Sequence, residues 1–346
     1  MIPAALRGHN DFLSFYTGAS LLHGEMYSAQ ANTRFQTEHV GFTRAGLLYI
    51  RPPFFAFFLR PLTWLPYRTA YLLFQALSVA ALFWFIWRFA RDLPALPVLC
   101  AFSIPVACNL VQGQDVVMVT AIAAAAILLR RSGRPFLGGL LFSVCAVKFH
   151  LFLLVPVALL CRREWRMLWG GFAGGVVLAG ISFLVDPHWL AQYGAALSDP
   201  RIHASIDAHI TVRALVVALT GQEGVPLIVG CLLVAAAAIW AIGRTDNLET
   251  SIAIALFADV ILGYHIFVYD ASILFLVAVL VARHPAREIV TLSLLPPVYL
   301  LGLLPGVFHA VLPAVLLAIF GSVLVSENQP GIGLAPRSVS PTPVSG

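Results

Sequence analysis

The sequence has little charge for its length. Only 11% of its 346 residues are Asp, Glu, Lys or Arg, whereas an ordinary soluble domain carries about 25%. Hydrophobic residues make up 60% of the chain, and its mean hydropathy is +0.89. So few charges cannot cover the surface of a soluble protein of this size. The composition therefore predicts an all-α polytopic membrane protein.

Several chemical signatures are also absent. The sequence has no Walker loop, dinucleotide fingerprint or nucleophile elbow, so nucleotide-dependent chemistry is unsupported. The five cysteines lie in or beside apolar runs, which indicates packing residues rather than a disulfide or metal set. No secretory signal peptide opens the chain, and no repeat of the solenoid kind is visible. The net charge of +5 comes from short arginine clusters and does not indicate nucleic-acid binding.

Apolar segments recur along the chain and predict one domain over residues 1–325. Residues 326–346 are rich in Ser, Pro and Gly and predict a disordered cytoplasmic tail. Gly170 and Gly174, like Gly171 and Gly175, permit close helix contact. Membrane spans are expected near residues 69–87, 94–111, 115–129, 167–185, 225–243, 250–263, 270–282, 288–304 and 307–325.

The segment 136–161 differs from the other apolar segments because arginines flank it on both sides. A single crossing would violate the positive-inside rule at one end. We therefore expect a re-entrant hairpin of two half-helices, with Lys148 near its tip. A second break, at Gln112-Gly113-Gln114-Asp115, is expected to form a hinge between two neighbouring spans.

The arginine clusters predict the orientation in the plasma (inner) membrane. If the spans alternate, the clusters from Arg88 to Arg287 fall on one side, which is cytoplasmic by the positive-inside rule. The outer side then collects Asp11, Arg51, the hinge, the long loop 186–223 and the stretch 264–270. A candidate site is therefore expected on the outer face. Met1 also falls outside with no span before it, which is unusual and suggests that one N-terminal helix is missing from the sequence.

Residues 1–66 form a polar and aromatic opening that we expect to be an outer-face interfacial segment. Phe12, Phe15, Tyr16 and Ala19 share one helix face and predict a helix lying on the bilayer, with Asp11 at its start. Asp11 is therefore either an N-cap only or a functional carboxylate. The apolar piece 54–59 follows a double proline and is too short to span, so an interfacial or re-entrant helix is expected.

Lys148 is the clearest candidate for chemistry, because a cation inside an apolar run is costly. It suits a phosphate, and the alternative is snorkelling to the interface. Gln112 and Gln114 can hold hydroxyls, although a plain helix turn is the alternative.

Histidines and carboxylates near the other breaks are weaker candidates. His150 and His265 are placed for hydrogen bonding or proton chemistry, and a structural role is an equal alternative for His150. Asp270 is interpreted as a helix N-cap. Asp199, His203 and Asp207 share a helix face, but they lack a defined ligand set, so no metal site is expected.

The order of several motifs resembles glycosyltransferase family 87 over about residues 10–285. The motifs are Asp11-Phe12…Tyr16…Leu22-x-Gly24-x-x-Tyr27, Tyr49-x-x-Pro52-Pro53-Phe54, Pro61-Leu62-x-x-Leu65-Pro66, Gly113-Gln114, Gly138-Gly139-Leu140…Lys148 and His265-x-x-x-Tyr269-Asp270. The resemblance implies a GT-C membrane fold with about ten transmembrane helices. It also implies a polyprenyl-phosphate-linked sugar donor, an acceptor met at the outer face, and Asp11 as catalytic base. The usual first span before that Asp is absent, and Arg51 stands where an aromatic or apolar residue is common.

The sequence thus predicts a hexosyltransferase, of mannosyltransferase type, that moves a sugar from a polyprenyl-phosphate donor to a lipid- or glycan-linked acceptor hydroxyl. Its partners are the donor, the acceptor and membrane lipids, with no nucleic acid and no further cofactor. Rival interpretations are a lipid or solute transporter or flippase, and a structural scaffold. The expected catalytic residue is Asp11, and the expected substrate-binding residues are Lys148, Arg51, His265, Gln112, Gln114, Tyr49 and His150.

Overall fold

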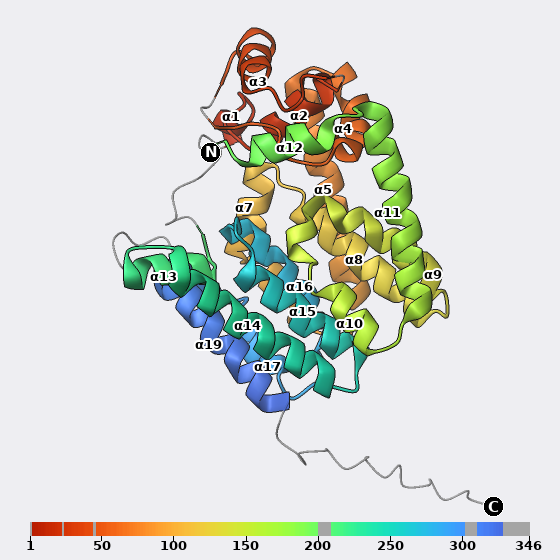
Figure 1. Cartoon of the computed structure of the whole chain (residues 1–346), viewed down its shortest axis with the longest axis vertical. Helices are drawn as coiled ribbons and strands as arrows, with labels where there is room; N and C mark the ends of the chain where they lie inside the picture. Colours follow the sequence, from red (N-terminus) through yellow and green to blue (C-terminus); the bar gives the residue numbers. More distant parts are fainter. Residues whose placement is uncertain (1, 23, 44–45, 200–208, 302–309, 328–346) are drawn as a thin grey trace, which may run out of the picture.

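Helices build the protein, and a computed structural model describes residues 2–22, 24–43, 46–199, 209–301 and 310–327 (Figure 1). The helices of the first half are α1 (Ile2–Ala5), α2 (Phe12–Ser20), α3 (Ala29–Phe35), η1 (Gln36–Val40), α4 (Pro53–Leu59), η2 (Arg60–Trp64), α5 (Tyr67–Phe89), α6 (Leu96–Ala101), α7 (Ile104–Gln112), α8 (Val116–Arg131), α9 (Pro135–Phe142), η3 (Ser143–Leu151) and α10 (Val155–Cys161). The second half contains α11 (Trp165–Val185), α12 (Trp189–Leu197), α13 (Val212–Thr220), α14 (Gly224–Arg244), α15 (Leu248–Leu262), η6 (Val268–Ile273), α16 (Leu274–Leu280), α17 (Arg287–Leu292), α18 (Pro296–Leu301) and α19 (Val311–Glu327).

Three of these helices, α5, α11 and α14, are long and apolar enough to cross a membrane. A fourth crossing results if α7 and α8, bent by 114° at the hinge, are counted as one span. About ten spans are therefore not confirmed among the described residues. Crossing the hydrocarbon core needs about 20 helical residues, and most other apolar segments are shorter or broken. The expected spans 94–111, 270–282 and 288–304 each divide into two helices: α6 and α7, η6 and α16, and α17 and α18.

The apolar face of α2 packs against protein, whereas the sequence predicts that this face lies on the bilayer. Phe12, Phe15, Tyr16 and Ala19 are each at most 9% exposed. The Phe12 ring lies 4.8 Å from the Phe74 ring of α5, measured between centroids. The amphipathic pattern was real, but a neighbouring helix covers the apolar face, because aromatic packing within the protein satisfies the same pattern as lipid does.

The hinge between α7 and α8 forms where the sequence predicted it, and Gly113 explains its sharpness. Gly113 has φ +65°, and a Cβ atom there would lie 2.7 Å from the Cβ of Phe12. The position therefore requires glycine for two reasons, a left-handed backbone and a close approach of α2. The hinge is packed directly against the N-terminal segment as a result.

The two ends of the segment 136–161 lie at the same end of the bundle, as a hairpin requires. Arg130, before the segment, pairs with Glu164, after it, at 2.5 Å. The rising arm is α9 and η3, the returning arm is α10, and Lys148 interrupts the first arm with φ −123° and ψ 53°. At the break, the Leu154 N–H donates to both carboxylate oxygens of Asp259, at 3.2 and 3.1 Å. Asp259 thus provides a hydrogen-bond acceptor for a backbone N–H at the start of α10, where such groups have no partner within the helix.

Small residues let α9 and α11 approach closely, as expected for Gly170 and Gly174. A Cβ on Gly170 would lie 2.0 Å from the carbonyl oxygen of Phe136, and one on Gly139 would lie 1.9 Å from that of Met167. A Cβ on Gly175, by contrast, would meet nothing within 4 Å. The contact face of α11 is therefore the face that carries Gly170 and Gly174.

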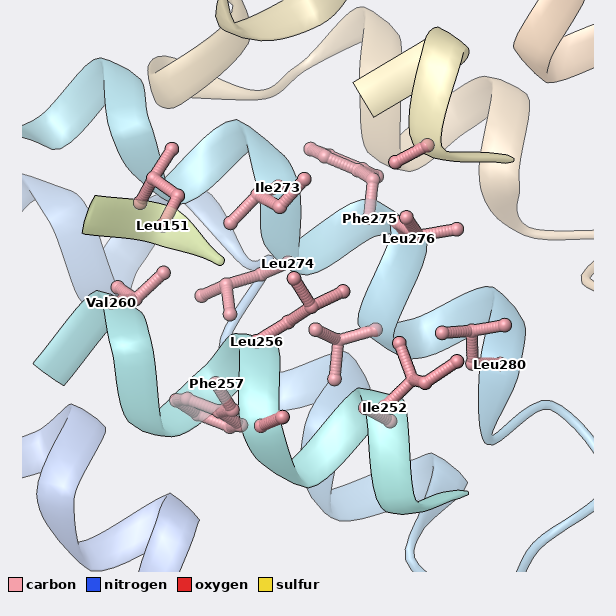
Figure 2. Packing of buried hydrophobic residues seen from close by; sticks show 14 of the residues in the cluster. Leu151, Ile252, Leu256, Phe257, Val260, Ile273, Leu274, Phe275, Leu276 and Leu280 are labelled. Carbon is pink, nitrogen blue, oxygen red and sulfur yellow. The ribbon is translucent and has the colours of Figure 1, made fainter. Parts of the chain in front are cut away.

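Helix α15 lies at the centre of the bundle and packs against α16 (Figure 2). Its side chains are apolar nearly all round, which is the pattern of a helix surrounded by protein. Ile252 and Leu256 of α15 contact the same cluster as Ile273 and Leu274. Leu151 from the hairpin joins this cluster, so the core holds the Lys148 arm against η6.

The arginine clusters meet at one end of the bundle, and the N-terminal segment lies at the other. Arg131 pairs with Glu249 at 2.5 Å, and Arg162 donates to the carbonyl oxygens of Ile242 and Gly243. Helix α11 runs from this end towards α12, which lies across the N-terminal helices (Figure 1). The residues proposed for chemistry therefore gather far from the arginine clusters along the long helices.

Candidate active site

Asp11 occupies the N-cap position of α2, but its side chain does not cap the helix. Its Oδ2 instead accepts a hydrogen bond from Gln114 Nε2 at 2.8 Å, and its backbone N–H donates to Gln112 O at 2.8 Å. The α7–α8 hinge therefore holds Asp11 at both its main chain and its carboxylate. The cap-only interpretation does not account for this geometry.

Four charged side chains lie together beside the hinge: Arg51, Asp115, Lys148 and Asp270. Lys148 Nζ is 2.5 Å from Asp270 Oδ1 and 3.4 Å from Asp115 Oδ1. Arg51 Nη2 is 3.6 Å from the same oxygen of Asp115. The side chains of Asp115, Lys148 and Asp270 are at most 2% exposed, and that of Arg51 is 12% exposed. Two cations and two carboxylates make this four-charge cluster neutral, which lowers the cost of burying it.

Helix breaks position each member of the cluster. Asp115 is the N-cap residue of α8, Lys148 has non-helical dihedral angles, and Asp270 lies in the first turn of η6. Asp270 Oδ2 also accepts from the Phe267 backbone N–H at 2.9 Å. Breaks allow side chains to leave the helix surface, so segments that are distant in sequence converge on one buried point.

Arg51 remains a cation in this environment. Burial is the largest single influence and lowers the pKa of its guanidinium, but Asp115, Tyr269 and Asp270 together raise this pKa by more, so the net shift is upward. The guanidinium carbon lies 5.6 Å from the centre of the Phe15 ring. Tyr27 fixes the main chain here, because its hydroxyl donates to Arg51 O at 2.7 Å.

Tyr269 connects Asp11 to the four-charge cluster. Lys148 Nζ lies 5.0 Å from the centre of the Tyr269 ring. The phenol also interacts electrostatically with Asp11, Arg51 and Asp115. The contact of Gln114 with Asp11 and those of Asp115 and Asp270 with the cations bring the N-terminal segment, the hinge, the hairpin and η6 together.

Tyr49 has a different position from the other predicted substrate-binding residues. It is 0% exposed, and its hydroxyl donates to Pro52 O at 2.8 Å and accepts from Ala56 N at 3.0 Å. Both partners are backbone atoms at the start of α4. This geometry gives Tyr49 a role in positioning the loop that carries Arg51.

The two predicted histidines lie close in sequence to members of the cluster, His150 to Lys148 and His265 to Asp270. His150 is half-buried, and it interacts electrostatically with Lys148, Arg51 and His265. His265 Nδ1 lies 3.4 Å from Nε2 of His209, a residue that the sequence interpretation did not use. Gln112 contributes its backbone carbonyl oxygen to Asp11, as described above.

No group of three or more metal-binding side chains occurs among the described residues. Of the three residues considered for a metal site, His203 and Asp207 lie outside the described residues, and only Asp199 lies inside them. The expectation of no metal site therefore remains a prediction.

Asp115 and Asp270 are the residues that sequence reasoning undervalued. The sequence predicts a hinge that contains Asp115 and a helix cap at Asp270. Asp270, the third residue of η6, does accept a hydrogen bond from the backbone N–H of Phe267. Its other carboxylate oxygen pairs with Lys148. A usable signal existed, because a lysine buried at membrane depth requires a carboxylate partner, and both aspartates follow breaks in apolar sequence.

Several buried polar atoms around the cluster have no hydrogen-bond partner among the described residues. Both carboxylate oxygens of Asp115 are in this state, although two cations lie within 4 Å of one of them. Gln114 Oε1, Arg51 Nε and His150 Nε2 are also without a partner. Such atoms are costly to bury, so the site has capacity for a polar ligand.

An apolar cavity of about 450 Å³ lies next to the hairpin. Both arms and α11 line it, including Phe142, Phe149, Phe152, Leu159 and Phe172. Its volume falls within the range of about 300–1,000 Å³ that is typical of small-molecule sites. Phe149 lies one residue from Lys148, so the polar cluster and the apolar cavity share one arm of the hairpin.

Comparison with protein families gives one match, to the model described as glycosyltransferase family 87, over residues 49–264. The matched region is more than half of the chain and contains Arg51, the hinge and Lys148. Asp11 precedes it, and His265 and Asp270 follow it. Comparisons with curated proteins and with solved structures give no match.

Proposed function

Because the chain belongs to glycosyltransferase family 87, and is in that sense a membrane glycosyltransferase, we propose that it transfers a hexose, with mannose as the first candidate, from a polyprenyl-phosphate donor. The acceptor is a hydroxyl of a lipid- or glycan-linked molecule. The reaction takes place at the outer face of the plasma membrane, at the end of the bundle opposite the arginine clusters.

The observation that carries this proposal is the contact between Asp11 and the hinge. A carboxylate that could accept a proton is held by Gln114, whose neighbour Asp115 lies between Arg51 and Lys148. Sugar transfer from a lipid phosphate needs both features, a base for the acceptor and cations for the leaving group. The contacts of Gln114 with Asp11 and of Asp115 with both cations support a site that holds both features.

The proposed reaction is a single displacement. The acceptor oxygen forms a bond to the anomeric carbon while the bond from that carbon to the phosphate oxygen breaks, and its electron pair leaves with the lipid phosphate. Asp11 takes the acceptor proton. Arg51 and Lys148 stabilise the charge that develops on the phosphate, with His265 at the edge of the site. Attack from the opposite face inverts the anomeric configuration.

Apolar surfaces near the cluster are suited to the polyprenyl chain. The cavity beside the hairpin offers aromatic and aliphatic contacts along the arm that carries Lys148. Phe57 and Phe58 of α4 are 45% and 51% exposed, while Phe54 is buried, so α4 also presents an apolar outer face. A lipid tail that binds along the hairpin would place its phosphate near Lys148.

The test is a transfer assay with the purified full-length protein in lipid nanodiscs. Radiolabelled decaprenyl-phosphate mannose serves as donor, and a membrane lipid extract serves as acceptor. We expect label to move into the extract and decaprenyl phosphate to be released, and we expect both to persist in EDTA. Decaprenyl-phosphate glucose, run in parallel, tests the choice of sugar.

The same preparation separates the enzyme from a lipid flippase. In proteoliposomes, a flippase would move labelled donor between leaflets without breaking the bond from sugar to phosphate. Donor movement without any release of decaprenyl phosphate, from a correctly folded protein, would contradict the proposed function.

A further inference from the structure

The two carboxylates of the four-charge cluster are held very differently. Asp270 has one oxygen 2.5 Å from Lys148 Nζ and the other bonded to the Phe267 N–H, so both oxygens are engaged. Asp115 makes no hydrogen bond with either oxygen, although its side chain is 2% exposed. Asp270 is thus an anchor for Lys148, whereas Asp115 is held only by longer-range attraction.

Asp115 Oδ1 lies between the two cations, 3.4 Å from Lys148 Nζ and 3.6 Å from Arg51 Nη2. An anionic oxygen of a phosphate would take this same position to contact both cations. While Asp115 remains there, the cluster has no net charge and little attraction for an anion. Displacing Asp115 costs no hydrogen bond, because it makes none.

The Asp115 carboxylate also has an alternative position, at the start of α8. It is the N-cap residue of α8, yet its side chain makes no capping hydrogen bond. An aspartate at this position typically accepts from the backbone N–H of the second or third helical residue, here Val117 or Met118. Its backbone is now in the helical region, with φ −94° and ψ −4°. A shift of Asp115 to the extended backbone typical of an N-cap would replace the attraction of the cations with a cap and with the favourable end of the helix dipole.

We propose that Asp115 is an internal stand-in for the lipid phosphate, and that it leaves the cations to cap α8 when donor binds and returns when product leaves. This inference rests on the proposed function. A phosphodiester donor carries one negative charge, whereas the monoester product carries about 1.5–2 at pH 7. Two fixed cations alone would hold the product more tightly than the donor. Competition from Asp115 weakens the binding of both, and release of the more tightly held product benefits from it.

The test compares wild type with Asp115→Asn in nanodiscs, by equilibrium binding of decaprenyl monophosphate and of uncharged decaprenol. Asn keeps the size of the side chain and removes the competing charge. We expect the variant to bind the monophosphate about tenfold more tightly or better, with unchanged binding of decaprenol. With decaprenyl-phosphate mannose and the acceptor extract, we expect a first turnover followed by slower steady-state release.

Two further variants make the outcome decisive. Asp115→Ser retains a good N-cap without charge, and it should reproduce the tighter binding if Asn perturbs folding. Asp92→Asn, at the arginine-rich end where Asp92 pairs with Arg283, should leave monophosphate binding unchanged.

Equal or weaker monophosphate binding by folded Asp115→Asn or Asp115→Ser would overturn the inference, as would the failure of both to fold. A wild-type protein that binds monophosphate no better than decaprenol would instead count against the proposed function. The two failures are therefore distinguishable.

Discussion

At the scale of single residues, the site shows how partners determine what a charge does. Asp11 lies at a helix start, where an aspartate usually caps, but its carboxylate bonds Gln114 instead. Lys148 is buried, where a lysine is usually excluded, because Asp270 and Asp115 neutralise it. Position in the sequence identified both residues, and neighbouring side chains set their roles.

Asp11→Asn should lower transfer by roughly 10²–10⁴-fold, the usual contribution of a general base. The amide keeps the shape of the side chain, and no side-chain cap is lost, since the structure has none. Folding should therefore survive. The measurement is the initial rate of label transfer, together with the thermal midpoint in detergent.

Glu25→Gln is the matched control for Asp11. Glu25 belongs to the same N-terminal segment, but it is exposed and pairs with exposed Arg34 at 3.7 Å, so neutralising it should leave the rate unchanged. A near-normal rate for folded Asp11→Asn would mean that the base lies elsewhere, with the loop 186–223 as the next region to search.

Lys148→Met should destabilise the protein as well as weaken donor binding. From the sequence alone, loss of the cation is expected to affect donor affinity only. In the structure, Lys148 is paired with Asp270, and removing one partner of a buried pair typically costs about 3–5 kcal/mol. The thermal midpoint of the variant should fall clearly.

Adding Asp270→Asn to Lys148→Met should recover much of that stability, because the uncompensated carboxylate is then removed. Donor affinity should remain weak in the double variant. Recovery of stability together with wild-type donor affinity would show that Lys148 does not bind the phosphate.

At the scale of elements, the hairpin depends on contacts that hold its two arms in place. Asp259 on α15 bonds the start of α10, and glycines bring α9 against α11. Each arm of the hairpin is therefore held by a neighbouring helix, the returning arm by α15 and the Lys148 arm by α11. The position of the Lys148 arm relative to η6 sets the short contact between Lys148 and Asp270.

Gly170→Ala should destabilise the hairpin by about 1–3 kcal/mol, the usual cost of overpacking. The new Cβ would lie 2.0 Å from the Phe136 carbonyl oxygen, which is a backbone atom and cannot move alone. Gly175→Ala on the same helix meets nothing within 4 Å, and it should be neutral or slightly stabilising. Thermal unfolding in detergent compares the two variants. Equal midpoints would contradict the packing argument.

At the scale of the whole molecule, three long helices separate the arginine clusters from the candidate site. The positive-inside rule predicts that the arginine end is cytoplasmic. Reporter fusions after Arg91, Arg134, Arg166 and Arg244 should therefore report the cytoplasm, and one near Asp199 should report the outside. A fusion at Arg166 that reports outside would contradict the hairpin, because Glu164 and Arg130 are paired.

The sequence by itself determined the class of protein and the breaks in its helices. Hydropathy identified a helical membrane protein, and the family match agrees with the resemblance of its ordered motifs. The hinge at Gly113, the hairpin flanked by arginines and the glycine face of α11 were predicted because each depends on local backbone or packing rules. The predicted number of about ten spans is not confirmed, since three or four helices among the described residues are long and apolar enough to cross a membrane.

Only the tertiary structure decided how the charges pair. The sequence interval between Asp11 and Gln114, or between Lys148 and Asp270, contains no information about their contact. In the sequence, the apolar face of α2 is equally compatible with lipid and with protein. In the structure, Phe74 lies beside it. The role proposed for Asp115 also depends on the tertiary structure, because the fold decides which hydrogen-bond partners lie near its carboxylate. Pairing energies depend on distance in space, and folding brings together residues that the sequence keeps apart.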